Sequence, residues 1–267
     1  MGTVYRIRDD RSAVRPSPVF LAVLGAFVLF GLMAWRYGPI PVMQLEKFAP
    51  ARLAVFGFVL AGWIVSLCLH EFGHAYLAYR AGDHGVAAKG YLTLNPLKYG
   101  DPILSFAMPV LFVLLGGIGL PGGAVWIDRG AIQGRLRHSL ISAAGPIANL
   151  ILAVLLAVTV SNLKGDDHSY FWSALAYLTF LQVTAALLNL LPIPGLDGFG
   201  IIEPYLPRKW VQQANEIGGY AFFGLIALLW IPAVNKVFFN TIFHITDLLR
   251  IDHYAIANGD FIFRFWS

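Results

Sequence analysis

Charged residues and cysteine are scarce in this 267-residue sequence. Asp, Glu, Lys and Arg make up 13% of the chain, against about 25% in a typical soluble domain. This scarcity, with 58% hydrophobic residues, excludes a disordered protein and argues against an ordinary soluble enzyme. The single cysteine, Cys68, excludes an intramolecular disulfide. The net charge of +4 is small and spread along the chain, so the sequence does not indicate nucleic-acid binding.

Long apolar tracts without Asp, Glu, Lys or Arg are abundant instead. A helix needs about 20 apolar residues to cross the hydrocarbon core of a bilayer. Together the tracts predict an all-α polytopic protein of the lipid bilayer, with about 5–6 transmembrane helices. The tracts are Phe20–Trp35, Leu53–Leu69, Pro102–Ile127, His138–Leu163, His168–Leu196 and Ile217–Asn235.

One membrane-embedded domain, residues 1–267, is expected to hold all of these tracts. The first tract follows four arginines and lacks a clear small-x-small cleavage site, so residues 1–52 are interpreted as an uncleaved N-terminal anchor. A core of about residues 53–205 carries the motifs described below. Residues 206–267 are expected to form a C-terminal span and then, from Lys236, a helix on the membrane surface.

The motif with the clearest chemistry directly follows the second tract. Leu53–Leu69 runs into His70-Glu71-Phe72-Gly73-His74, an H-E-x-x-H sequence in a helical pattern. His70 and His74 share one helix face, so both imidazoles can reach one metal ion. Glu71 lies about 100° around the helix and can act on water without being a ligand. A pair of structural histidines is the alternative, but without partners they would cost about a few kcal/mol each.

A third ligand is expected because catalytic zinc usually has three protein ligands and an open position. The tract His168–Leu196 ends in Leu191-Pro192-Ile193-Pro194-Gly195-Leu196-Asp197-Gly198, where prolines and glycines break the helix. Irregular backbone at membrane depth is tolerated only where it is buried in protein or lines a cavity. We therefore predict that Asp197 binds the metal. The alternatives are a capping role for Asp197 and a third-ligand role for His84.

These motifs resemble the site-2 proteases, a family of intramembrane zinc metalloproteases. Their order and spacing are similar to a compact bacterial branch without PDZ or CBS domains. The sequence departs from that branch at Gly82-Asp83-His84-Gly85-Val86, where a Gly-Asp-Pro-Thr-Ala run is often found. The matching segments are His70–His74, Leu92–Lys98, Asp101-Pro102, Ala144–Asn149 and Asn189–Gly198.

The resemblance implies a role for each matching residue. The zinc ligands would be His70, His74 and Asp197, with one Zn²⁺ per chain. Glu71 would be the general base and later the proton donor. The reaction would be hydrolysis of a peptide bond in or near the transmembrane segment of a membrane protein.

Asn149 and Asn189 are implied to lie near the substrate and the developing oxyanion. A hydrogen bond between helices is the alternative reading for each of them. The implied partner is a single-span membrane protein; the sequence names neither that substrate nor the oligomeric state. Two other functions stay open: a non-catalytic membrane binding protein of the same fold, and a zinc transporter.

The metal site also constrains the topology. The ligands lie at the C-terminal ends of Leu53–Leu69 and His168–Leu196, so these tracts should cross in the same direction, with the Asn149 span antiparallel between them. Pro102–Ile127 must then cross zero or two times, and its Pro109 and glycines favour a re-entrant hairpin. More Lys and Arg then fall on the inner side, which predicts a multi-pass cell-membrane protein with its N-terminus and active site toward the cytoplasm.

Overall fold

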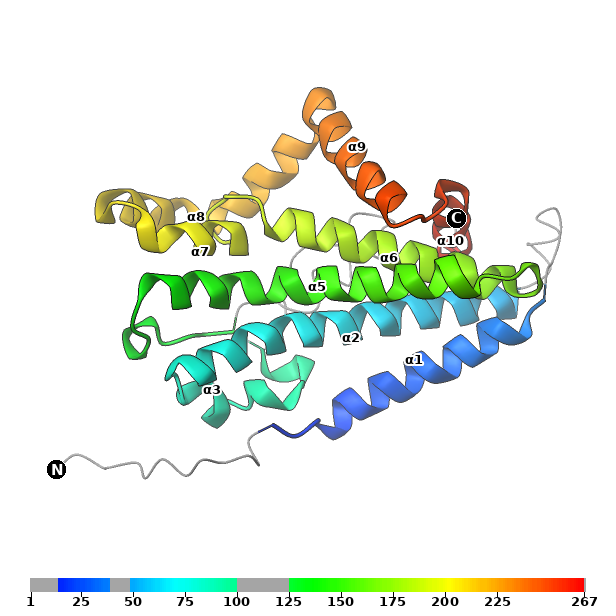
Figure 1. Cartoon of the computed structure of the whole chain (residues 1–267), viewed down its shortest axis with the longest axis horizontal. Coiled ribbons are helices and arrows are strands. Elements are labelled where there is room, and N and C mark those ends of the chain that lie inside the picture. The colour runs from blue at the N-terminus through cyan, green and yellow to red at the C-terminus, as the bar shows by residue number, and fades with distance from the viewer. Residues whose placement is uncertain (1–13, 39–48, 100–124, 267) are drawn as a thin grey trace.

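The computed structural model describes residues 14–38, 49–99 and 125–266, and within these residues it contains helices and no strand (Figure 1). The prediction of an all-α membrane protein is confirmed. The α-helices are α1 (Pro18–Arg36), α2 (Ala49–Ala81), α3 (Gly85–Ala88), α5 (Arg135–Leu163), α6 (Ser169–Asn189), α7 (Asp197–Ile202), α8 (Arg208–Leu229), α9 (Pro232–Leu248) and α10 (His253–Phe263). Short 3₁₀ turns are η2 (Tyr91–Thr93), η3 (Pro96–Lys98), η5 (Arg129–Ala131), η6 (Asp166–His168) and η7 (Glu203–Tyr205).

Among the described residues, four helices are long and apolar enough to cross a membrane: α1, α2, α5 and α6. They coincide with four of the predicted tracts. Helix α2 continues past Leu69 through the whole H-E-x-x-H motif, as predicted. Helix α1 begins at Pro18, and the hydroxyl of Ser17 before it accepts a hydrogen bond from the Phe20 amide. Proline suits the first position of a helix because a backbone N–H there would have no partner within the helix.

Helices α2, α5 and α6 form the body of the molecule. Helix α5 packs against both others, and Figure 1 shows that α2 and α6 run in the same direction while α5 runs in the opposite one. The predicted relative directions of these helices are therefore confirmed. A Cβ at Gly73 would lie 3.1 Å from the Ala144 carbonyl oxygen, so α2 and α5 approach closely at the level of the motif.

Helix α1 packs along α2 through aromatic rings set against glycines. An added Cβ at Gly57 would meet the Phe30 ring, and one at Gly62 would meet Phe27. Missing side chains on α2 thus make room for large side chains on α1. Such close packing stabilises helix pairs in a bilayer, where helix association gains little from the hydrophobic effect.

The predicted C-terminal span Ile217–Asn235 is not one helix. Helix α8 ends at Leu229 and α9 begins at Pro232, which has no N–H for a continuing helical ladder. The helix predicted after Lys236 is present as the later part of α9. Its apolar face packs on α6 through Ile242, Phe238, Phe239, Ile245 and Leu249.

Most of the predicted hairpin Pro102–Ile127 lies outside the described residues. The residues at either side of residues 100–124, Tyr99 and Val125, are both buried in one apolar cluster with Cys68 and Ala75 of α2. Both flanks of residues 100–124 thus belong to the cluster around the C-terminal half of α2, which is compatible with a re-entrant segment. The hairpin itself stays a prediction.

Candidate metal centre

Helix α2 presents both histidines of the motif to the interior of the bundle. His70 and His74 are one helical turn apart and are 5% and 6% exposed. Their Nε2 atoms lie 3.1 Å apart. The i, i+4 spacing on a regular helix produces this convergence, as the sequence predicted.

Asp197 reaches the two histidines from α7, after the predicted break in the chain. Its carboxylate oxygens lie 3.2 Å from His70 Nε2 and 3.3 Å from His74 Nε2. The break requires glycine at two positions: Gly195 has φ +93°, and a Cβ at Gly198 would collide with the Leu190 and Leu191 carbonyls. Ligand atoms of the three side chains all lie within 4.8 Å of one another, a group that could hold a metal ion.

The segment that carries Asp197 is fastened to the start of α5 and the turn before it. The Ser139 hydroxyl donates to the Ile201 carbonyl at 2.6 Å, and Arg129 forms an ion pair with Glu203 at 2.5 Å. These contacts, at the C-terminal end of α7 and just after it, help to hold the Asp197 carboxylate in place. Asp197 is thus positioned by tertiary contacts as well as by its own turn.

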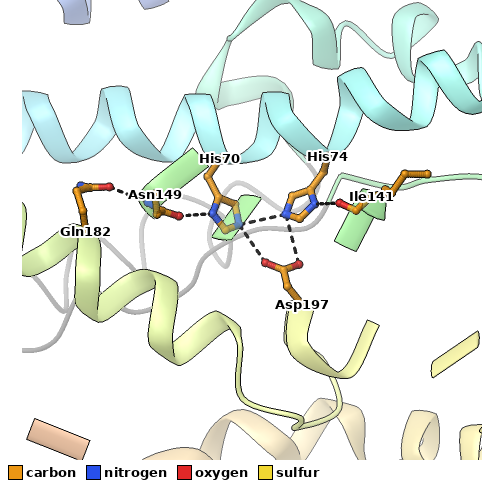
Figure 2. Close-up of polar contacts among 6 residues, drawn as sticks. All are labelled: His70, His74, Ile141, Asn149, Gln182 and Asp197. Carbon is orange, nitrogen blue, oxygen red and sulfur yellow. Dashed lines mark hydrogen bonds and ion pairs between the residues drawn. The ribbon is translucent and has the colours of Figure 1, made fainter. Parts of the chain in front are cut away.

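The hydrogen bonds of the two imidazoles fit a cation between them (Figure 2). His74 Nδ1 lies 2.7 Å from the Ile141 carbonyl oxygen, which can only accept, so Nδ1 carries the proton. His70 Nδ1 lies 2.5 Å from Asn149 Oδ1. In the neutral rings both Nε2 atoms therefore present lone pairs toward each other and toward a carboxylate. These groups repel one another unless a cation lies among them, and two imidazoles with a carboxylate suit Zn²⁺.

Asp197 completes the group with a carboxylate, since a carboxyl group binds a metal ion in its deprotonated form.

Gly145 of α5 forms the wall behind the two ligand nitrogens. A Cβ at this position would collide with Nε2 of both His70 and His74. Any other residue would therefore occupy the space around the ligand atoms. The sequence analysis included Gly145 in a matching segment but did not assign it to the site.

Glu71 lies beside this group and outside it. Its side chain is 1% exposed, and its carboxylate interacts with the backbone of Val125. Glu71 also interacts electrostatically with His70, His74 and Asp197. A buried carboxylate next to a candidate metal centre is suited to taking up and releasing a proton.

The other predicted site residues differ in their placement. Asn149 is 2% exposed and contacts Nδ1 of His70, on the side of the ring away from the ligand group. Asn189 is buried at the last position of α6, before the turn that leads to Asp197. Contacts of either asparagine with a substrate stay a prediction. His84 lies outside the ligand group, at the N-cap of α3 against the Tyr79 ring.

Gln182 was missed by the sequence analysis. It is fully buried on α6 and accepts a hydrogen bond from Asn149 at 2.7 Å through Oε1. A signal was present, because a polar amide within an apolar tract needs a buried partner. The sequence does not say which helix supplies that partner.

Comparisons with known proteins agree with this chemistry. The chain matches no protein-family profile, and no solved structure matches it at a significant level. It is 46% identical to a protein of Mycolicibacterium smegmatis named "Putative zinc metalloprotease Rip2", over 98% of both chains. It is 45% identical to the Mycobacterium tuberculosis protein of the same name, over 97% of both chains. A Bacillus subtilis protein named "Putative zinc metalloprotease YwhC" is 31% identical over 70% of this chain and 87% of its own.

Two observations agree that the enzyme is a metalloprotease and that its metal is zinc. One is the similarity to these proteins over nearly the full chain, and the other is the H-E-x-x-H motif on a helix apolar enough to cross a membrane. The chain is a zinc metalloprotease and belongs to the site-2 protease family, in its compact branch.

Proposed function

We propose that this protease hydrolyses a peptide bond in or near the transmembrane segment of a single-span membrane protein. The position of the site supports the proposal. The motif lies on α2, a helix apolar enough to cross a membrane, and its interior face meets α5 and α6, two further such helices. In this proposal, the peptide bond is cleaved at membrane depth.

In this proposal His70, His74 and Asp197 hold the zinc ion. Zinc supplies Lewis acidity toward water and toward the scissile carbonyl group. His70 donates its Nδ1 proton to Asn149 Oδ1, and His74 donates its Nδ1 proton to the Ile141 carbonyl, so both Nε2 atoms stay available.

Glu71 moves the protons. Its carboxylate takes one proton from the attacking water as the new C–O bond forms. The same proton then goes to the leaving amine nitrogen as the C–N bond breaks, so Glu71 returns to its starting form. The second proton of the water remains with the new carboxyl group, which ionises.

The substrate must present an unpaired carbonyl group. Backbone hydrogen bonds occupy the carbonyls of an intact helix, so the substrate helix has to unwind locally, and helix-breaking residues near the cleaved bond favour this. Asn189, at the end of α6, is proposed to hold the unwound backbone. We further propose that the enzyme resides in the cell membrane with its N-terminus and site toward the cytoplasm.

Cleavage by the reconstituted enzyme tests the proposal. Purified protein in liposomes is mixed with a single-span substrate, and Glu71→Gln is compared with wild type. We expect the variant to keep its zinc and to lose about 10²–10⁴-fold in cleavage rate. Glu216→Gln, at an exposed position on α8, is the matched control and should cleave normally.

Each alternative predicts a different result. A non-catalytic binding protein would retain the substrate uncut with and without Glu71, and a transporter would move zinc into the liposomes. Wild-type cleavage by Glu71→Gln would assign the proton transfer to another group. Cleavage of soluble peptides but of no membrane-embedded substrate would overturn the intramembrane proposal.

A further inference from the structure

A closed set of hydrogen bonds joins α2, α5 and α6 next to His70, and Figure 2 shows its part from Gln182 through Asn149 to His70. His70 on α2 contacts Asn149 on α5, which donates through Nδ2 to Gln182 Oε1 on α6 at 2.7 Å. Gln182 Nε2 donates to the Ser66 hydroxyl on α2 at 2.9 Å. Ser66 precedes His70 by four residues, on the same face of the helix, so the connection returns to the helix on which it began.

The donors and acceptors of this connection have one consistent direction. The Ser66 hydroxyl donates to the Trp63 carbonyl at 2.7 Å, so its oxygen is free to accept from the Gln182 NH₂ group. The oxygen of Gln182 then faces Asn149 and receives one of its N–H groups. The Asn149 oxygen consequently faces His70 and accepts the Nδ1 proton. A backbone carbonyl one helical turn before Ser66 thus sets which nitrogen of His70 carries the proton.

We propose that Gln182 is a positioning residue for the zinc centre: by holding the Asn149 amide with its oxygen toward His70, it keeps His70 Nε2 available to the metal. The proposal rests on the ligand assignment made above, but not on the identity of the substrate. Without the Gln182 acceptor, the Asn149 amide can turn its NH₂ group toward His70. Nδ1 would then have to accept, and the proton would move to Nε2, which cannot then bind zinc.

The three side chains that connect Ser66 to His70 are buried, so the loss of one hydrogen-bond partner is not compensated by water. Exposed fractions are 3% for Ser66, 2% for Asn149 and 0% for Gln182, so water cannot replace a missing partner. If Gln182 served helix packing alone, its loss would lower thermal stability but would not act on zinc binding through His70. A positioning role predicts an effect on zinc affinity that depends on His70.

Zinc affinity measured against a chelator tests the proposal in the purified full chain. Gln182→Met keeps the volume and removes the acceptor, and we expect it to bind zinc about 10–100-fold more weakly. Gln182→Glu keeps an oxygen toward Asn149 in either protonation state and should restore most of the affinity. Thr179→Val is the matched control, because Thr179 is also buried on α6 but bonds only to the Leu175 carbonyl of its own helix.

A double-variant comparison separates this proposal from the ligand assignment. In a His70→Ala background, Gln182→Met should weaken zinc binding no further, because its effect passes through His70. Full zinc affinity in His70→Ala alone would reject the ligand assignment. If His70→Ala binds zinc measurably but more weakly, wild-type affinity in a folded Gln182→Met protein overturns the positioning role, as does an equal loss from Gln182→Met in both backgrounds. If Gln182→Met does not fold, Ser66→Ala decides, and unchanged affinity there overturns the proposal.

Discussion

At the scale of single residues, the site is made by what is missing as well as by what is present. His70 and His74 converge because no side chain projects from Gly145 into the space between them. Glu71 is buried beside this group and interacts with both histidines and with Asp197. Burial of a carboxylate is costly, so Glu71 is a candidate for a functional rather than a stabilising role.

Gly145→Ala should impair zinc binding without changing any charge or ligand. The added methyl group collides with Nε2 of both histidines, so either the rings move or α5 shifts, at a cost of about 1–3 kcal/mol. Zinc content and chelator resistance of the purified variant measure the effect. Gly224→Ala on α8, where a Cβ would meet nothing within 4 Å, is the control. Full zinc content with wild-type chelator resistance in Gly145→Ala would contradict this account of the wall.

At the scale of elements, irregular segments are held in place by buried polar contacts. Asp83, just after α2, is 3% exposed and accepts backbone N–H groups from Gly85 at 2.9 Å and from Asp128 at 2.7 Å. The second bond fixes the segment that begins at Val125, in the cluster beside α2. Asp83 keeps the Asp of the family run, just before the departure that begins at His84, and its two accepted bonds hold this turn.

Asp83→Asn should loosen the segment around Asp128 while leaving the helices intact. An amide offers one acceptor and one donor where two N–H groups must be accepted, so about 1–3 kcal/mol of local stability is lost. Hydrogen exchange at residues 125–131 should become faster, with exchange in α6 unchanged. Asp167→Asn, at an exposed position, provides the comparison. Unchanged exchange at residues 125–131 would mean that other contacts hold this segment.

At the scale of the whole molecule, the metal centre joins parts of the chain that are far apart in sequence. The two histidines come from α2, Asp197 comes from α7, and α5 supplies the wall between them. A zinc ion held by these three side chains would tie the C-terminal part of the chain to the helix that carries the motif. Zinc should stabilise the folded protein as well as serve catalysis.

Zinc removal should lower the melting temperature of the purified protein. A ligand present at about 1,000 times its dissociation constant stabilises the native state by about 4 kcal/mol. We expect a zinc-selective chelator to produce a loss of several degrees that added zinc reverses. Asp197→Ala should melt early and respond little to chelator or zinc. Equal chelator sensitivity of that variant and wild type would indicate that zinc is held elsewhere.

Surface labelling tests the proposed orientation of the molecule. Leu97 in η3 and Gln133, just before α5, are exposed, and Lys164 directly follows the last residue of α5. In a Cys68→Ser background, Leu97→Cys and Gln133→Cys should react with an impermeant thiol reagent only in opened cells, and Lys164→Cys should react in intact cells. Labelling of Gln133→Cys without Leu97→Cys from outside would show a single crossing between them. Labelling of both would invert the orientation.

Local patterns in the sequence determined the helices and most of the metal centre. The i, i+4 histidines and the run of prolines and glycines before Asp197 act over a few residues, where helix geometry and proline chemistry leave few choices. The same reasoning failed for the predicted span Ile217–Asn235, where Pro232 begins a second helix. That prediction followed the apolar composition of the tract and did not treat Pro232 as a helix break.

Only the tertiary structure decided which distant polar groups meet. Gln182 and Ser66 are separated by 116 residues and bond directly, and Asn149 joins that pair to His70. An amide within an apolar tract is expected to need a buried hydrogen-bond partner, but several helices carry polar groups that could supply it. The packing of α2, α5 and α6 selects the partner, because buried donors and acceptors must all be satisfied at once within one close-packed interior.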